Sequence, residues 1–122
     1  MRRLLRGSVA LLLTVGVAAA VAQTCRKTLS NVVNTGQCIT VSTTAVDVLT
    51  ANSSRCSALI LNNSVNGMNC RDLADGAPTA TAGTPVLAGG GTLALGLESQ
   101  GRWQCIRSGG ADAIACVTEG RP

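Results

Sequence analysis

The chain has 122 residues, the size of one domain, and carries ten basic and six acidic side chains. Three of the basic residues, Arg2, Arg3 and Arg6, lie at its start, so the rest holds seven basic against six acidic residues. This near balance, with one Trp and no Tyr, Phe or His, argues against nucleic-acid binding, base stacking, His-dependent nucleophiles and His-ligated metals. We therefore expect no nucleic-acid partner, no metal and no cofactor.

Residues 1–22 have the pattern of a secretory signal peptide. Basic residues precede an apolar run from Val9 to Ala22, which ends in the small-residue motif Ala20-Val21-Ala22. As a helix this run would span about 21 Å, less than the ~30 Å hydrocarbon core of a bilayer. We expect cleavage before Gln23, a periplasmic or extracellular location, and no membrane span after cleavage.

Six cysteines follow the predicted signal peptide, and export with an even cysteine count predicts disulfides. Their spacing contains no C-x-x-C knuckle, which argues against a metal cluster. The predicted disulfide residues are Cys25, Cys38, Cys56, Cys70, Cys105 and Cys116.

The first half of the mature chain alternates short β-prone runs with turn residues. The dipeptide Asn66-Gly67 favours a hairpin between the fourth and fifth runs. The fourth run is the most apolar and is expected at the centre of the core. The predicted strands are residues 29–33, 38–43, 45–49, 56–61 and 68–73.

The second half begins with residues 74–91, which are rich in Ala, Gly, Thr and Pro and are expected to form a surface connection. Residues 92–97 read as a strand with three leucines on one face. Residues 102–107 and 113–118 then flank Ser108–Asp112 as a predicted hairpin.

These elements predict an all-β fold, a small antiparallel β-sandwich or barrel of about eight short strands over residues 23–122. A core of Leu, Ile, Val and Ala without large aromatic residues is thin, so disulfides are expected to staple it.

The spacing of the cysteines leaves fifteen pairings open. If the last hairpin turns at Gly110 and Ala111, Cys105 lies opposite Cys116. The same reasoning favours the sequential pairs Cys25–Cys38 and Cys56–Cys70.

Three stretches, "ITVSTTAVDVLTANSSRCSALILNNS", "GTPVLAGGGTLALG" and "WQCIRSGGADAIACVTE", resemble small β modules of tailed-phage and prophage structural proteins. The first matching element is a turn of small residues and Asn that ends in Arg, at 51–55, and the second is a strand that ends in Asn-x-Ser, at 59–64. The third is a connection rich in Gly and Pro that contains "AGG", at 85–95. The last is a C-terminal strand with the sequence Val-Thr-Glu, within 106–119. The resemblance implies a compact β-sandwich that decorates or connects virion parts without catalysis.

Trp103 is the only aromatic side chain and has Arg102 and Arg107 beside it. These three residues are candidates for binding a protein partner. The alternative is that Trp103 packs in the core against a nearby disulfide.

The other candidate sites are better explained as turns than as functional sites. Asp72 and Asp75 are clustered carboxylates that could serve a hydrolase or calcium, but a solvated turn explains them. Lys27 and Ser30 lack the context of a dyad. The sequons at Asn52 and Asn62 and the Gly89-Gly90-Gly91 run are expected to be unmodified turns.

The sequence therefore predicts a non-enzymatic exported structural or binding module of phage-like ancestry, which presents a surface to a protein partner or to copies of itself. Exposed edge strands would permit assembly by strand addition. The alternative is a periplasmic or secreted inhibitor or defence protein that occludes an enzyme or receptor, with Trp103 and residues 74–91 as its contact surface.

Overall fold

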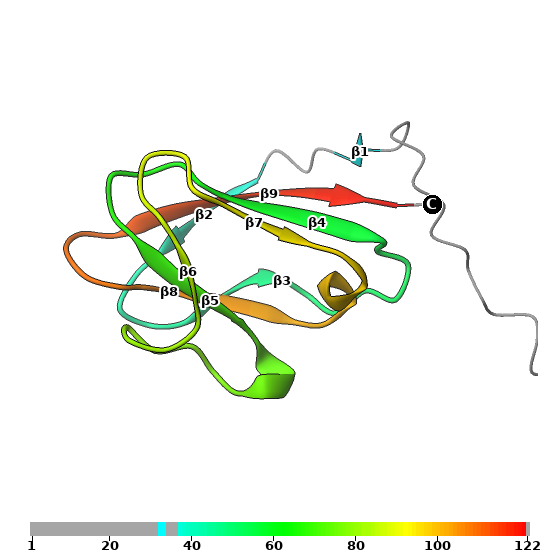
Figure 1. Ribbon diagram of the computed structural model, residues 1–122, viewed down its shortest axis with the longest axis horizontal. Coiled ribbons are helices and arrows are strands. Elements are labelled where there is room, and N and C mark those ends of the chain that lie inside the picture. Colours follow the sequence, from blue (N-terminus) through cyan, green and yellow to red (C-terminus); the bar gives the residue numbers. More distant parts are fainter. Residues whose placement is uncertain (1–31, 34–36, 122) are drawn as a thin grey trace, which may run out of the picture.

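The computed structural model describes residues 32–33, of which only the backbone is considered, and 37–121. The predicted signal peptide, Cys25, Lys27 and Ser30 lie outside these residues. The strands are β1 Val32–Val33, β2 Cys38–Val41, β3 Val46–Leu49, β4 Ser57–Asn62, β5 Met68–Asp72, β6 Thr84–Val86, β7 Thr92–Leu95, β8 Trp103–Arg107 and β9 Ala113–Gly120 (Figure 1). Two short 3-10 helices, η1 Leu73–Asp75 and η2 Leu97–Gln100, complete the described elements.

All strand pairs are antiparallel and form two sheets, which confirms the predicted all-β class. In sheet A, β9 pairs on one side with β4 and on the other side with β1 and β2, which pair with different parts of β9. β7 pairs with the other side of β4 and forms the opposite edge of the sheet. Sheet B has the order β3-β8-β5-β6. Figure 1 shows β9, β4 and β7 in one layer and β3, β8 and β5 in the other.

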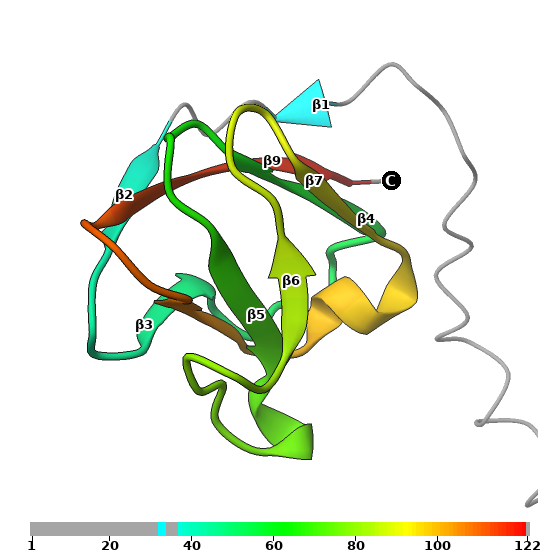
Figure 2. The same cartoon turned by 60° about the vertical axis from the view of Figure 1, so that its left-hand side comes forward.

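The strands pair from the outside of the sequence inward, as they would in one long hairpin. β2 pairs with β9, β3 with β8, β4 with β7, and β5 with β6. The contacts β4–β9 and β5–β8 then roll this long hairpin onto itself (Figure 2). The strands β2, β9, β4 and β7 of sheet A and the four strands of sheet B, linked in this way, have the topology of a jelly roll.

The core lies between the sheets and consists of aliphatic side chains, one disulfide and Trp103. In β9, Ala113, Ala115 and Val117 are buried, while Ile114 is exposed. This alternation is the pattern expected of a strand with one face on the core. β4 is a central strand of sheet A, as its apolar sequence predicted.

Two predicted hairpins are wrong. β4 and β5, which flank Asn66-Gly67, belong to different sheets, and so do β8 and β9, which flank Ser108–Asp112. Both turns cross from one layer to the other. Short-range turn residues can reverse a chain without making the flanking strands pair, because pairing is decided by which layer each strand enters.

The predicted surface connection 74–91 contains a strand that the sequence analysis missed. β6 closes the edge of sheet B, and Val86 and Pro78 are buried. The Asn69 side chain donates to the carbonyls of Thr79 and Ala80, which holds the connection against β5. At 92–97, only Leu93 and Leu95 face inward, because β7 ends at Leu95 and Leu97 is exposed.

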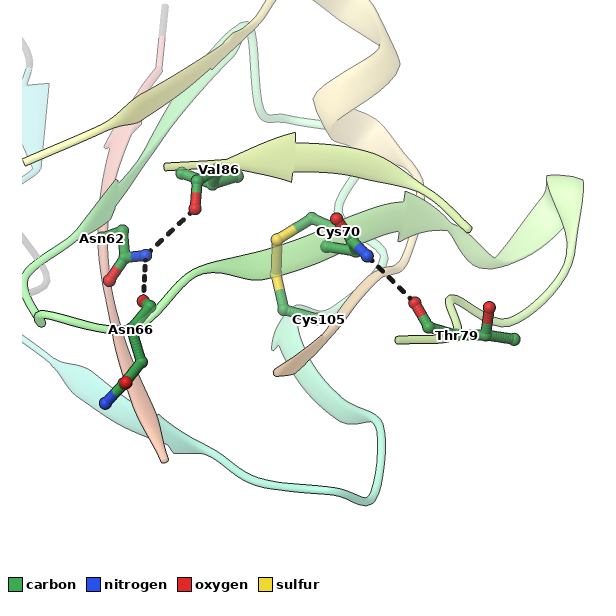
Figure 3. Close-up of a disulfide and its surroundings, with 7 residues drawn as sticks. Asn62, Asn66, Cys70, Thr79, Val86 and Cys105 are labelled. Carbon is green, nitrogen blue, oxygen red and sulfur yellow. Dashed lines mark hydrogen bonds between the residues drawn. A yellow bond between two sulfur atoms is a disulfide. The ribbon is translucent and has the colours of Figure 1, made fainter. Parts of the chain in front are cut away.

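Disulfides join directly opposed residues on neighbouring strands. Cys38 bonds Cys116 across β2 and β9. Cys70 bonds Cys105 across β5 and β8 (Figure 3). The Cα atoms are 4.1 Å apart in each pair. Cys56 is also disulfide-bonded.

The predicted pairs Cys105–Cys116, Cys25–Cys38 and Cys56–Cys70 are therefore wrong. Cys105 faces the core of sheet B with no exposed surface, whereas Cys116 lies on the outer face of sheet A. The two side chains belong to different sheets and cannot meet.

We expect the two described disulfides to differ in their rates of reduction. Cys38 is exposed, whereas Cys70 and Cys105 have no exposed surface, and thiol–disulfide exchange requires access to a sulfur. Mild dithiol treatment of the native protein, followed by alkylation and mass spectrometry, should label Cys38 and Cys116 first. Equal labelling of Cys70 and Cys105 at early times would contradict the fold.

Candidate functional site

The outer face of sheet A is the candidate functional surface. Strand alternation turns every second side chain of its strands away from the core. The outward positions of the described strands are Cys38 and Thr40 on β2, Ser57, Leu59 and Leu61 on β4, Thr92 and Ala94 on β7, and Ile114, Cys116, Thr118 and Gly120 on β9.

The registers order these side chains into rows across the strands. One row runs Cys38, Cys116, Leu61 and Thr92, so the disulfide continues into an aliphatic side chain. The next row runs Thr118, Leu59 and Ala94. Side chains that are directly opposite on one face contact each other, so these rows form a continuous surface.

None of these outward positions carries a charge, and two large apolar side chains among them, Leu59 and Ile114, are each 38% exposed. Exposed apolar area on a sheet face that lacks charge is typical of a contact surface, because binding desolvates no ionised group there.

The outer face of sheet B has a different chemistry. The Asp47 carboxylate on β3 accepts two hydrogen bonds from the Arg102 guanidinium, at 2.9 and 2.7 Å, and one from Gln104 at 2.8 Å. These hydrogen bonds, first of all the one from Arg102, hold the pKa of Asp47 below its ordinary value. This face is charged and hydrated, and covering it would cost desolvation.

A buried ion pair lies between the sheets at the end where β9 finishes. The Arg55 guanidinium donates to Glu119 Oε1 at 2.7 Å and to the carbonyls of Thr50 and Ser99. Arg55 and Glu119 are 1% and 8% exposed. One side chain thus joins the turn before β4, the end of β3, η2 and β9.

Neither Arg55 nor Glu119 is among the site residues predicted from the sequence. Both belong to the quoted motifs, as the Arg that ends the 51–55 turn and the Glu of the terminal Val-Thr-Glu strand. Their contact spans 64 positions of sequence, which no local pattern reveals.

A cavity of about 290 Å³ opens between the edge strands β2 and β3. It is lined by Gln37, Ile39, Asp47, Val48, Leu49, Thr50, Val117 and Glu119. Its two carboxylates already have guanidinium partners, Arg102 for Asp47 and Arg55 with Arg121 for Glu119. The lining is therefore charge-compensated.

Trp103 is a core residue. It is 8% exposed and packs in the same cluster as Cys105, and its indole N–H donates to the carbonyl of Glu98 at 3.0 Å. Its ring is therefore mostly buried, and its role in partner binding stays a prediction. Arg102 precedes β8 and Arg107 is its last residue; they form ion pairs with Asp47 and Asp112, and their role in partner binding stays a prediction.

Asp72 and Asp75 belong to the turn around η1. Asp72 accepts a hydrogen bond from the backbone N–H of Ala74 and caps η1, and Asp75 lies in its first turn. Gly76 follows with a φ of 104° and donates its N–H to Leu73. These contacts are those of a capped turn.

Asn62 organises the loops at the opposite end of the sandwich. Its side chain is fully buried and donates to the carbonyls of Asn66 and Val86 (Figure 3). Its carbonyl oxygen accepts a hydrogen bond from the Ser64 hydroxyl. A glycosylating enzyme could not reach it in the folded protein. Gly89 and Gly90 have positive φ values in the adjoining turn, as expected for the glycine run.

No helix of the described residues is long and apolar enough to cross a membrane. Comparison with protein-family models, curated proteins and solved structures finds no match to the chain.

We expect Arg55→Met to destabilise the protein by about 3–5 kcal/mol, because it leaves the buried Glu119 carboxylate without its main partner. The double variant Arg55→Met/Glu119→Leu should recover much of this loss, since it removes both charges. Urea unfolding of the three proteins measures the difference. A single variant as stable as the wild type would contradict the buried pair.

Acidification should remove the stabilisation that Asp47 provides. Because its folded pKa is lowered, Asp47 stabilises the fold above its unfolded pKa of about 3.9 and loses that contribution as pH falls through the folded pKa. The stability difference between wild type and Asp47→Asn should therefore be present at neutral pH and vanish in acid. NMR titration should show a higher Asp47 pKa in Arg102→Gln.

Proposed function

We propose that the protein is a non-enzymatic, exported structural module that binds a protein partner, or an assembly of partners, through the outer face of sheet A. The observation that carries the proposal is the chemistry of that face. Leu59 and Ile114 are exposed on it, the Cys38–Cys116 disulfide crosses it, and its described positions hold no charge.

The energetic contrast between the two sheets supports this choice. Apolar area contributes about 25 cal/mol per Å² when it leaves water, and sheet A offers such area without an ionised group. Burying the face of sheet B would remove water from Asp47 and Arg102, whose side chains are 34% and 49% exposed. Sheet A is therefore the better docking face.

Phage-like ancestry is part of the same proposal. Arg55 and Glu119, two signature positions of the resemblance, meet in the buried ion pair, and the Asn62-x-Ser64 element ties two loops together. Jelly-roll topology also occurs in viral capsid and lectin domains, although a fold alone does not decide function. The disulfides indicate an oxidising environment, and we place the protein in the periplasm or outside the cell.

The inhibitor alternative would use a different surface. Leu87, in the 74–91 connection, and Val65, in the β4–β5 loop, are 72% and 88% exposed. Their loops lie side by side (Figure 2), joined by a 2.7 Å hydrogen bond from Gly89 N–H to the Ser64 carbonyl. An inhibitor would insert these two side chains into its target.

Matched variants separate the two surfaces. Leu59→Ser/Ile114→Ser should remove the partner that cross-links to and co-purifies with the wild-type protein in its native exported fraction, because the face loses its apolar side chains. Val65→Ser/Leu87→Ser removes two side chains that are more exposed than Leu59 and Ile114, at another place on the surface, and should retain that partner. The reverse result would favour the inhibitor, and retention by both variants would contradict both proposals.

A further inference from the structure

The edges of the two sheets differ in how well they are protected against pairing with another strand. An exposed edge offers unpaired N–H and C=O groups, and proteins block it with proline, bulges or charge. β6 is three residues long and contains Pro85. β3 has a register shift between Asp47 and Leu49 and carries a charged carboxylate. Both edges of sheet B are therefore blocked.

The β7 edge of sheet A has none of these devices. Its residues Thr92, Leu93, Ala94 and Leu95 include no proline and no charge, and their register against β4 is regular. β4 is the strand to which β7 pairs, and β7 ends the order of sheet A. Thr92 and Ala94 are exposed on the outer face, and Leu93 and Leu95 point inward.

We propose that β7 binds β7 of a second copy of this chain in antiparallel fashion about a twofold axis. This inference rests on the proposed function, because it gives the means of assembly. In the pair, Leu93 lies opposite Leu93 of the partner, and Thr92 lies opposite Ala94. The register between the two strands must place inward-facing residues opposite inward-facing residues, because a register change of one residue would expose the leucines to solvent.

The ends of β7 select this register. An in-phase register centred on Thr92 would place Ala94 opposite Gly90, which lies before β7 and has a φ of 98°. An in-phase register centred on Ala94 lays the partner strand over Gly96. There the backbone N–H of Gly96 already donates to Glu98 Oε1 at 2.8 Å, so an anionic side chain covers that end. Centring on Leu93 leaves the two Glu98 carboxylates at opposite ends of the pair and outside it.

A second copy fits this edge because it supplies the same short, uncharged strand with the same alternation. A twofold contact uses one surface twice and closes on itself. The two sheets A then form one continuous sheet, and their uncharged outer faces become one surface of twice the area. The contact between two four-residue strands is small, so we infer a weak dimer with a dissociation constant in the micromolar range.

Sedimentation equilibrium of the oxidised protein between about 10 and 500 μM tests the dimer. Wild type should dimerise reversibly. Thr92→Lys/Ala94→Lys places like charges opposite each other twice and should weaken the dimer at least about tenfold. Thr40→Lys/Thr118→Lys adds the same charge to the same face away from β7 and should change the constant less than about twofold. Thermal melting confirms that each variant is folded.

A charge swap tests the register. In Thr92→Glu/Ala94→Lys, each introduced carboxylate faces an ammonium group of the other copy, and the dimer should tighten about fivefold. Monomeric wild type at 500 μM, or a swap that weakens the dimer as the double-lysine variant does, would overturn the proposal.

The outcome is separable from that of the proposed function. Leu59→Ser/Ile114→Ser alters the face and leaves the β7 edge intact, so it should dimerise as wild type does even where partner binding is lost. If monomeric Thr92→Lys/Ala94→Lys still binds the partner, the proposed function stands without the dimer. The sedimentation results then decide whether the β7 contact exists.

Discussion

Two disulfides between directly opposed cysteines fasten short strands to their neighbours in the sheets. β2 has four residues and, among the described strands, pairs only with β9, to which the bond between Cys38 and Cys116 fastens it. The bond between Cys70 and Cys105 links β5 to β8, a contact that closes the roll. Each bond restricts the unfolded chain by about 4 kcal/mol, given sequence separations of 78 and 35 residues. This is a large share of a small domain's stability.

The covalent links supplement a small core that contains polar groups as well as apolar side chains. Ala58, Ala113 and Ala115 lie in this core beside larger residues such as Ile60 and Met68, and each alanine buries little apolar area. The Arg55–Glu119 pair and Asn62 satisfy buried polar groups at the two ends of the sandwich. The charged side chains of the described strands thus lie inside the sandwich or on sheet B, and the outer face of sheet A is left neutral.

The sequence predicted most strands within two residues, because alternation of apolar and polar residues is a local property. It did not predict the topology. The turns at Asn66-Gly67 and Ser108–Asp112 have hairpin composition, yet each connects different sheets. β6 was missed because Thr84-Pro85-Val86 is short and contains proline, and the cysteine pairs followed the wrong hairpins. The candidate surface also required the registers, since Leu59, Thr118 and Ala94 are far apart in the chain.

Peptide mapping without reduction tests the account most directly. Trypsin cleaves after Arg107, between Cys105 and Cys116, and after Arg55 and Arg71. In protein from its native location, peptide 103–107 should be linked to peptide 56–71, and the peptide containing Cys38 should be linked to peptide 108–122, since trypsin does not cleave the Arg121–Pro122 bond. A link between peptides 103–107 and 108–122, or six free thiols, would contradict the fold.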